Sequence, residues 1–129
     1  MEIEDFTYIV ETDKNFDEAV VSVLKTVESR GWTLFNVHDI KERLAAKGFE
    51  QEPLKIIEFC SGKYANAFLN ENKLSSLCMP CKINVFEENG QVKIAGMKPT
   101  IMSEFFKEIK RDEAEEVENI IKEIINNSK

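Results

Sequence analysis

The sequence predicts an α+β fold with two layers, in which an antiparallel sheet packs against helices. Short runs rich in β-branched and aromatic residues alternate with amphipathic helical stretches. Two of these runs are joined by Asn89-Gly90, a strong type I′ hairpin signal, so their strands must be antiparallel. A long amphipathic stretch near the C-terminus supplies a helix to cover one face. The predicted order is β-α-β-(α)-β-(α)-β-β-α.

The first strand and helix are predicted from residue types and capping signals. Residues 6–12 contain mostly β-branched and aromatic side chains and indicate a strand. Asn15 is placed to cap the following helix, and Glu18 completes a capping box. Gly31 is placed to end this helix in a left-handed cap. One apolar stripe runs along it: Phe16, Ala19, Val20, Val23, Leu24 and Val27.

The second and third strands flank a short helix. Residues 32–37 indicate the second strand, after which Asp39 caps a helix that extends to Ala46 and is closed by Gly48. Residues 54–59 indicate the third strand, which ends at Cys60.

The segment after Cys60 is predicted to contain one short helix and a connector. Ser61 can cap the helix, and residues 70–80 form the connector. Four apolar side chains share one side of the helix: Tyr64, Ala65, Phe68 and Leu69.

The C-terminal part contains the hairpin and the longest helix. Residues 82–87 and 91–97 alternate apolar and polar side chains and form the hairpin strands, after which Pro99 stops the sheet. A short helix is expected at residues 103–109, and the last helix at about residues 112–125. The buried stripe of the last helix is expected to be Ala114, Val117, Ile120, Ile121, Ile124 and Ile125.

Length and charge exclude several functional classes. The 129 residues fit one domain, residues 1–129, and 17 basic against 24 acidic residues give a net charge of −7. This acidity argues against binding to nucleic acid or to anionic lipid. No apolar run approaches the roughly 18 residues of a membrane span, and the acidic N-terminus lacks a secretory signal pattern. With an odd number of cysteines, three, we expect a cytoplasmic protein.

The cysteines mark the one place where the sequence suggests chemistry. Cys60 ends the third strand and Cys81 begins the fourth, so antiparallel pairing of these strands would bring both residues to one edge of the sheet. Cys78 lies one turn before Cys81. His38, the single histidine, stands at the end of the second strand and is a further candidate at this edge.

Four interpretations of these cysteines remain open. Cys78 and Cys81 form a CxxC motif that could cycle between dithiol and disulfide, although it leads into a strand and not into a helix. Cys60, Cys78 and Cys81 with His38 have the ligand types of a zinc site. One accessible thiolate could carry sulfur or form an adduct. In the fourth interpretation, all three thiols are small apolar groups of the core.

Two residues after Cys60 suggest an anion site. Lys63 and Tyr64 follow Cys60 at a predicted helix start, where backbone N–H groups could receive an anionic ligand. An ordinary cap by the Ser61 side chain explains the same pattern.

Residues over most of the chain resemble a known family. The segments are Glu58-Phe59-Cys60-Ser61, Ala65, Leu69, Met79-Pro80-Cys81-Lys82-Ile83 and Val85-Phe86-Glu87-Glu88-Asn89-Gly90, with Phe16-Asp17-Glu18-Ala19 and Gly31-Trp32 before them. Together they are similar to the signature of the domain-of-unknown-function 302 (DUF302) family. The chain departs from this signature at Ser61-Gly62, where Asn-Pro is usual, and at Cys78, where an apolar residue is usual.

The resemblance implies a fold and no established activity. It implies a TATA-binding-protein-like α+β domain of order β-α-β(4)-α, which often forms a dimer. It also implies that Cys60 and Cys81 are the shared cysteines, while Cys78 is particular to this chain.

Three functional hypotheses follow. The first, preferred because the sequence shows no phosphate loop and no recognisable acid–base pair, is a non-catalytic module that binds a small molecule or a partner, expected as a homodimer. The second is a thiol protein that carries sulfur or redox equivalents on Cys60 and Cys81. The third is a structural zinc site; no cofactor is expected otherwise.

Overall fold

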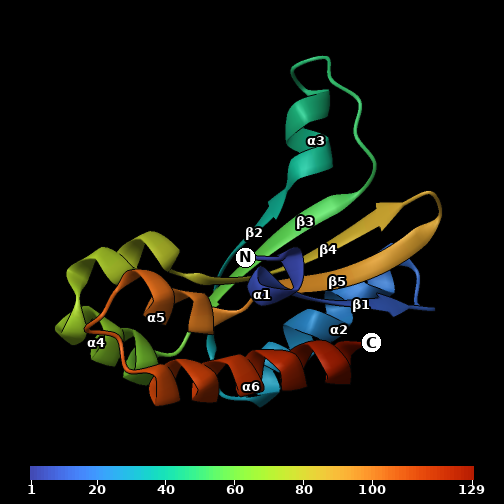
Figure 1. Ribbon diagram of the computed structural model, residues 1–129. Helices are drawn as coiled ribbons and strands as arrows, with labels where there is room; N and C mark the ends of the chain where they lie inside the picture. Colours follow the sequence, from blue (N-terminus) through green and yellow to red (C-terminus); the bar gives the residue numbers. More distant parts are fainter.

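A five-stranded antiparallel sheet forms one layer of the computed structural model, which describes residues 1–129. The strands are β1 (Thr7–Thr12), β2 (Thr33–Asp39), β3 (Leu54–Cys60), β4 (Cys81–Glu88) and β5 (Gln91–Met97). Their order across the sheet is β1-β5-β4-β3-β2, and every neighbouring pair is antiparallel (Figure 1). The predicted α+β class and the β-α-β(4)-α order are therefore confirmed.

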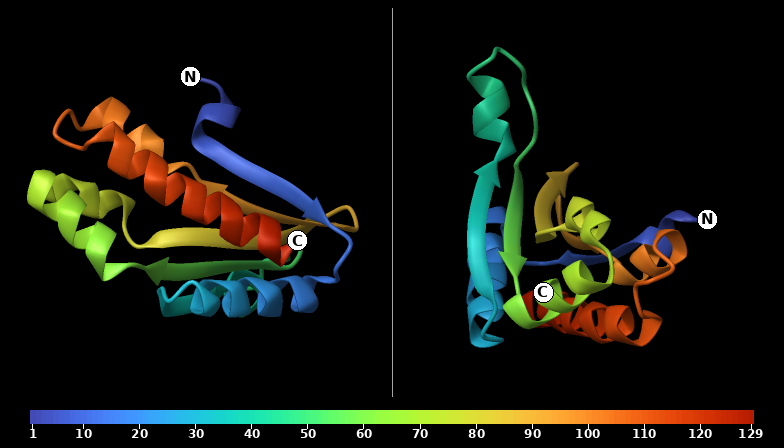
Figure 2. Two further views of the ribbon diagram at one scale, coloured as in Figure 1. Left: turned by 90° about the horizontal axis from the view of Figure 1, so that it is seen from below. Right: turned by 90° about the vertical axis from the view of Figure 1, so that its left-hand side faces the viewer.

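Two long helices form the second layer. α2 (Phe16–Ser29) and α6 (Arg111–Ser128) lie side by side across one face of the sheet (Figure 2). The remaining helices are short: α1 (Ile3–Phe6), α3 (Ile40–Ala45), α4 (Gly62–Glu71), α5 (Met102–Phe105) and the 3₁₀ helices η1 (Lys73–Cys78) and η2 (Pro99–Ile101). No helix of the chain combines the length and the apolar character that crossing a bilayer requires.

The core lies between the sheet and the two long helices. Both predicted stripes face it, since Val23 and Val27 of α2 and Ile124 and Ile125 of α6 are fully buried. α6 packs closely on the sheet at Gly96, where an added Cβ would lie 3.1 Å from Ile125 Cδ1. A glycine at this position of β5 therefore sets how near the helix can pack.

The capping signals found in the sequence act as predicted at most helix ends. The Asn15 side chain accepts the Glu18 N–H at 2.9 Å, and the Glu18 side chain completes the capping box of α2. Asp39 likewise accepts the Glu42 N–H at 3.0 Å and begins α3. Ser61 precedes α4 as predicted, but its side chain makes no capping bond.

Two segments differ from the sequence prediction. Part of the predicted connector at residues 70–80 is the helix η1, begun by Asn72, whose side chain accepts the Leu74 N–H at 2.8 Å. The helix predicted at residues 103–109 is the shorter α5, because Phe106 has an extended backbone with φ −112°. α6 extends beyond both predicted ends, to Arg111 and Ser128.

The β2–α3–β3 segment projects beyond the rest of the sheet. α3 stands at its tip and buries none of its residues (Figure 1). Phe49, in the loop after α3, is exposed. This arm lies at the end of the sheet opposite to Cys60, because β3 runs from the arm toward Cys60.

Candidate functional site

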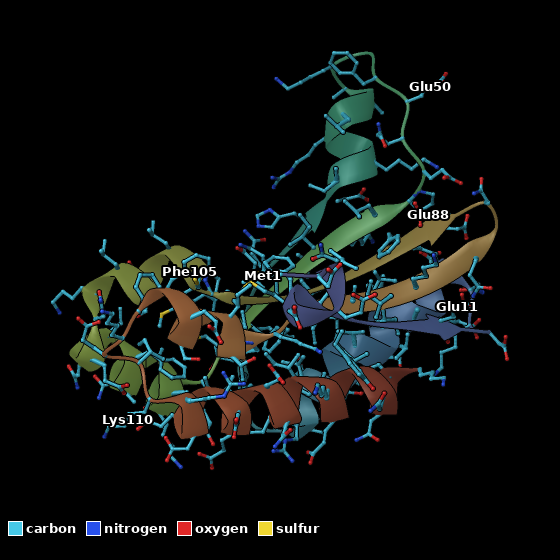
Figure 3. The ribbon with its side chains drawn as sticks, viewed as in Figure 1. Met1, Glu11, Glu50, Glu88, Phe105 and Lys110 are labelled. Carbon is cyan, nitrogen blue, oxygen red and sulfur yellow. The ribbon has the colours of Figure 1, made fainter.

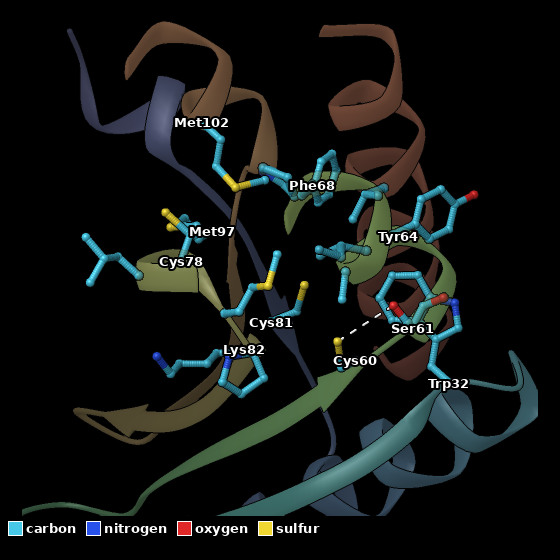
Figure 4. Close-up of a pocket in the computed structure, with 17 residues that line it drawn as sticks. Trp32, Cys60, Ser61, Tyr64, Phe68, Cys78, Cys81, Lys82, Met97 and Met102 are labelled. Atoms are coloured by element: carbon cyan, nitrogen blue, oxygen red, sulfur yellow. Dashed lines mark hydrogen bonds between the residues drawn. The ribbon is translucent and has the colours of Figure 1, made fainter. Parts of the chain in front are cut away.

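Strand pairing brings two of the cysteines to one end of the sheet. Cys81, the first residue of β4, lies directly opposite Phe59 of β3, so Cys60 is the next residue along. The predicted antiparallel pairing of the third and fourth strands is thereby confirmed. Figure 4 shows the Cys60 and Cys81 side chains pointing into the same space, with Cys78 farther away on the other side of Cys81.

This end of the sheet contains a cavity of about 160 Å³ lined by 17 residues, of which 13 are hydrophobic (Figure 4). The ends of β3, β4 and β5 form its floor, and α4, η1, α5 and α6 enclose it. The cavity exists because the chain leaves the sheet here in short helices that pack over the strand ends. Its lining is far more hydrophobic than that of the larger, polar surface recesses beside Lys14 and Thr100.

Aromatic side chains form one wall of the cavity. The rings of Trp32 and Phe59 lie 5.6 Å apart and tilted by 45°, and the Tyr64 ring lies 5.9 Å from that of Trp32. Such tilted contacts are the geometry that aromatic pairs favour. Phe68, buried on α4, continues the wall. Trp32, Phe59 and Phe68 belong to the buried core, and the sequence gave no sign that Trp32, Tyr64 and Phe68 line a cavity.

Hydrogen bonds hold the short helices over the cavity. The Lys110 backbone N–H donates to Glu71 Oε1 at 2.8 Å, and Asn72 Nδ2 donates to Glu108 at 3.2 Å. These bonds join the end of α4 to the loop between α5 and α6. The Thr100 hydroxyl donates to Glu118 Oε1 at 2.7 Å and fixes η2 against α6. The short helices over the cavity are therefore held in place by hydrogen bonds between segments far apart in the sequence.

Sulfur is concentrated in this cavity. The chain has three cysteines and four methionines, and only Met1 among these seven residues lies elsewhere. The six that line the cavity are Cys60, Cys78, Met79, Cys81, Met97 and Met102. The sequence pointed to the cysteines through strand ends, but it did not indicate the methionines, since Met97 and Met102 follow the hairpin and reach the cavity only through the fold.

All three thiols are held in the neutral form. Burial raises the pKa of Cys60 and that of Cys78 above the ordinary value. Cys81 lies deepest, and burial together with the neighbouring Cys60 and Cys78 thiols raises its pKa to about 12. The Lys82 ammonium opposes this shift only in part. The site therefore lacks the electropositive, solvent-exposed surroundings that make a cysteine a strong nucleophile at neutral pH.

His38 does not belong to this site. It pairs with Ile56 in the middle of β3, and its Nε2 lies 2.7 Å from Glu58 Oε1. Its position at the arm end of β2 follows from antiparallel pairing with β3, which places Thr33, not His38, opposite Cys60. Including His38 among the candidate site residues was therefore wrong.

The zinc interpretation also lacks the necessary ligands. No three His, Cys, Asp or Glu side chains gather closely enough to hold a metal ion, the three cysteines included. A structural zinc ion takes four nitrogen, sulfur or oxygen ligands in tetrahedral geometry.

Of the two remaining candidate residues, Ser61 lines the cavity and Lys63 does not. Ser61 lines the cavity, and its carbonyl oxygen accepts the Cys60 thiol at 3.7 Å. Lys63 is exposed outside it, with its Nζ 5.2 Å from the centre of the Tyr64 ring. The lysine that does line the cavity is Lys82, which the sequence analysis did not single out as a site residue. Lys82 directly follows Cys81 in the sequence, and this position could have indicated that it lies at the same site.

Comparison with known proteins agrees with the fold. Residues 8–128 match the family described as domain of unknown function DUF302. The crystal structure of an uncharacterized conserved DUF302 protein from Bacillus stearothermophilus is similar, with a TM-score of 0.88 and 26% sequence identity over 96% of this chain and 98% of that chain. No curated protein matches. Since the family match covers almost the whole sequence, the chain belongs to the DUF302 family.

Proposed function

We propose that the protein is a non-catalytic binding module that holds a small, mostly apolar molecule in the cavity at the end of its sheet. The observation that carries this proposal is a partly open cavity of about 160 Å³ with 13 hydrophobic residues among its 17 lining residues. An apolar protein cavity of about 150 Å³ stays dry and binds benzene. The expected ligand is therefore about the size of a single aromatic ring.

The chemistry of the lining favours binding over catalysis. The 17 residues include neither a histidine nor a carboxylate, so no pair of groups could take up and return a proton near neutral pH. The raised thiol pKa values also disfavour the alternative, a sulfur carrier or thiol-redox protein that uses Cys60 and Cys81.

The mouth of the cavity suggests the orientation of the ligand. Leu77 lines it and is 78% exposed, so the cavity opens to solvent beside an apolar side chain. Lys82 is exposed at the cavity and has no carboxylate within ion-pair distance. An anionic group on the ligand would accordingly lie beside the Lys82 ammonium, with the apolar part inside.

The experiment is a titration with fluorobenzene, followed by fluorine NMR and by the fluorescence of Trp32, the only tryptophan, which lines the cavity. We expect one saturable site. Ala65→Phe should abolish binding because the new ring would occupy the space that Ala65 borders. Asn66→Phe, on the exposed side of the same helix, is the matched control and should bind normally.

A second titration tests the anionic end. 4-Fluorobenzoate should bind more tightly than fluorobenzene, and Lys82→Met should remove that difference. Absence of saturable binding by either probe, with Trp32 unperturbed, would contradict the proposal.

We also propose that a second copy of the chain covers the outer edge of β2. β2 is the last strand of the sheet, so one side of its backbone lacks a strand partner. Phe35 is 61% exposed in the bulge of this strand, and Val37 is 38% exposed. Pairing of two β2 edges about a twofold axis would satisfy the backbone and cover both side chains.

Light scattering after size exclusion tests this dimer. The wild type should have twice the mass of one chain, and Val37→Lys should have the mass of one. Val21→Lys, on the exposed face of α2, is the control and should remain dimeric. A monomeric wild type would overturn the proposal.

The proposed compartment is the cytoplasm. All three cysteines are free, which suits a reducing environment.

A further inference from the structure

The most unusual property of the cavity is the chemistry of its sulfur atoms. Every cysteine and every methionine except Met1 lines it, although the cavity uses only 17 of the 129 residues. An ordinary apolar pocket could be built from valine and isoleucine, which are abundant in this core. Thiolate and thioether sulfurs are soft ligands, and soft ligands select soft metal ions.

Two of the thiols are positioned to act together. Cys81 lies opposite Phe59 in the β3–β4 pairing, Cys60 is the next residue of β3, and both cysteines line the cavity at the strand ends. Figure 4 shows these two side chains directed into one space, while Cys78, the last residue of η1, lies farther from Cys60, on the other side of Cys81. The arrangement thus offers two thiol sulfurs with thioethers nearby, and not the four ligands that zinc requires.

We propose that Cys60 and Cys81 bind one Cu(I) ion in the sulfur-lined cavity. Cu(I) accepts two thiolate ligands, and thioethers such as those of Met79, Met97 and Met102 are compatible further neighbours. As the ion binds, each thiol releases its proton to solvent and forms one S–Cu bond. Copper remains Cu(I), so no electron is transferred.

The charges around the site suit a monovalent ion. Cu(I) with two thiolates carries a net charge of −1, which the Lys82 ammonium beside the cavity can offset. Lys82 has no other ion-pair partner, and no carboxylate lines the cavity. The inference adds a second ligand to the cavity and does not rest on the proposed binding of an apolar molecule.

The test is an anaerobic titration with Cu(I), supplied as its acetonitrile complex, against the coloured chelator bathocuproine disulfonate. The wild type should withdraw one Cu(I) per chain. Cys60→Ser and Cys81→Ser should each lower the affinity by at least about 100-fold, since loss of even an indirect partner of a ligand costs up to that factor. Cys78→Ser is the matched control and should stay within a few-fold of the wild type.

Two further readouts keep the outcome decisive. Cu(I) should change the fluorescence of Trp32 in the wild type and in Cys78→Ser, but not in Cys60→Ser. If circular dichroism shows that Cys81→Ser does not fold, Cys60→Ser alone decides. The proposal is overturned if the wild type takes no copper, if Cys60→Ser binds like the wild type, or if Zn(II) binds as tightly as Cu(I). Failure of fluorobenzene to bind would leave it intact.

Discussion

Cys81 lies directly opposite Phe59 in the pairing of β4 with β3, and this register places the Cys60 and Cys81 thiols at one end of the sheet. The same register places Phe59 on the core side, in contact with Trp32, so the cysteines and the aromatic wall are arranged by one set of backbone hydrogen bonds. A shift of the pairing by one residue would turn these side chains to the opposite face. The cavity therefore depends on strand register as much as on the residues that line it.

Gly96→Ala should destabilise the fold by about 1–3 kcal/mol, the usual cost of adding a methyl group to a packed core. The new Cβ would lie 3.1 Å from Ile125 Cδ1 and 3.2 Å from Ile121 Cγ2, so these two packed side chains would have to shift. The free energy of unfolding in urea measures the effect. Gly62→Ala, where an added Cβ meets nothing within 4 Å, is the control and should be neutral or stabilising. Equal stability of the two variants would show that α6 does not pack on Gly96.

Two capping residues should differ in their effect on global stability. Asn15→Ala should lower the free energy of unfolding by about 1 kcal/mol, because it uncaps α2, whose stripe is part of the core. Asp39→Ala removes an equivalent bond from α3, which buries nothing. It should fray α3 without changing global unfolding. Urea unfolding measures the first effect, and hydrogen exchange of residues 40–45 measures the second. Similar losses of global stability for both variants would contradict this expectation.

The folded protein should react slowly with the thiol reagent 5,5′-dithiobis(2-nitrobenzoate) at pH 8, and Cys81 should react last. A pKa of about 12 in place of the ordinary 9.0 reduces the thiolate fraction at this pH by about a thousandfold. Cys60 and Cys78, whose pKa values are also raised, should react before it. Absorbance of the released thiolate measures the rates, and the protein in guanidinium chloride, where all three should react at once, is the control. Three fast thiols in the folded state would instead support the sulfur-carrier alternative.

Local signals predicted the fold well because they act over short distances. The Asn15 capping box, the Asn89-Gly90 hairpin and the alternation of Ile83 and Val85 each specify one element without information from the rest of the chain. Antiparallel pairing then follows from chain direction, which is how Cys60 and Cys81 could be placed together.

The cavity could not be predicted in the same way. Trp32, Met97 and Val117 come from distant segments and meet only after α4, η1 and α5 fold over the strand ends. In the sequence these residues are recognisable only as apolar, and apolar residues are expected both in a packed core and in the wall of an apolar cavity. His38 was misplaced for a related reason: a strand end does not indicate which end of the sheet it reaches until the pairing is known.

The free energy of unfolding should fall as the pH rises above about 9, and Cys81→Ala should weaken this dependence. In the unfolded chain the Cys81 thiol ionises at its ordinary pKa of 9.0, whereas burial in the folded protein raises its pKa to about 12. Between these values the folded state binds more protons, so stability is fully present below pH 9 and is lost as the pH rises toward 12, by up to about 1.4 kcal/mol per pH unit. Urea midpoints from pH 7 to pH 10 measure the slope. Cys78→Ala, which removes a less perturbed thiol, is the control and should retain most of it. An unchanged slope in Cys81→Ala would mean that the Cys81 thiol is not held neutral by its position at the floor of the cavity.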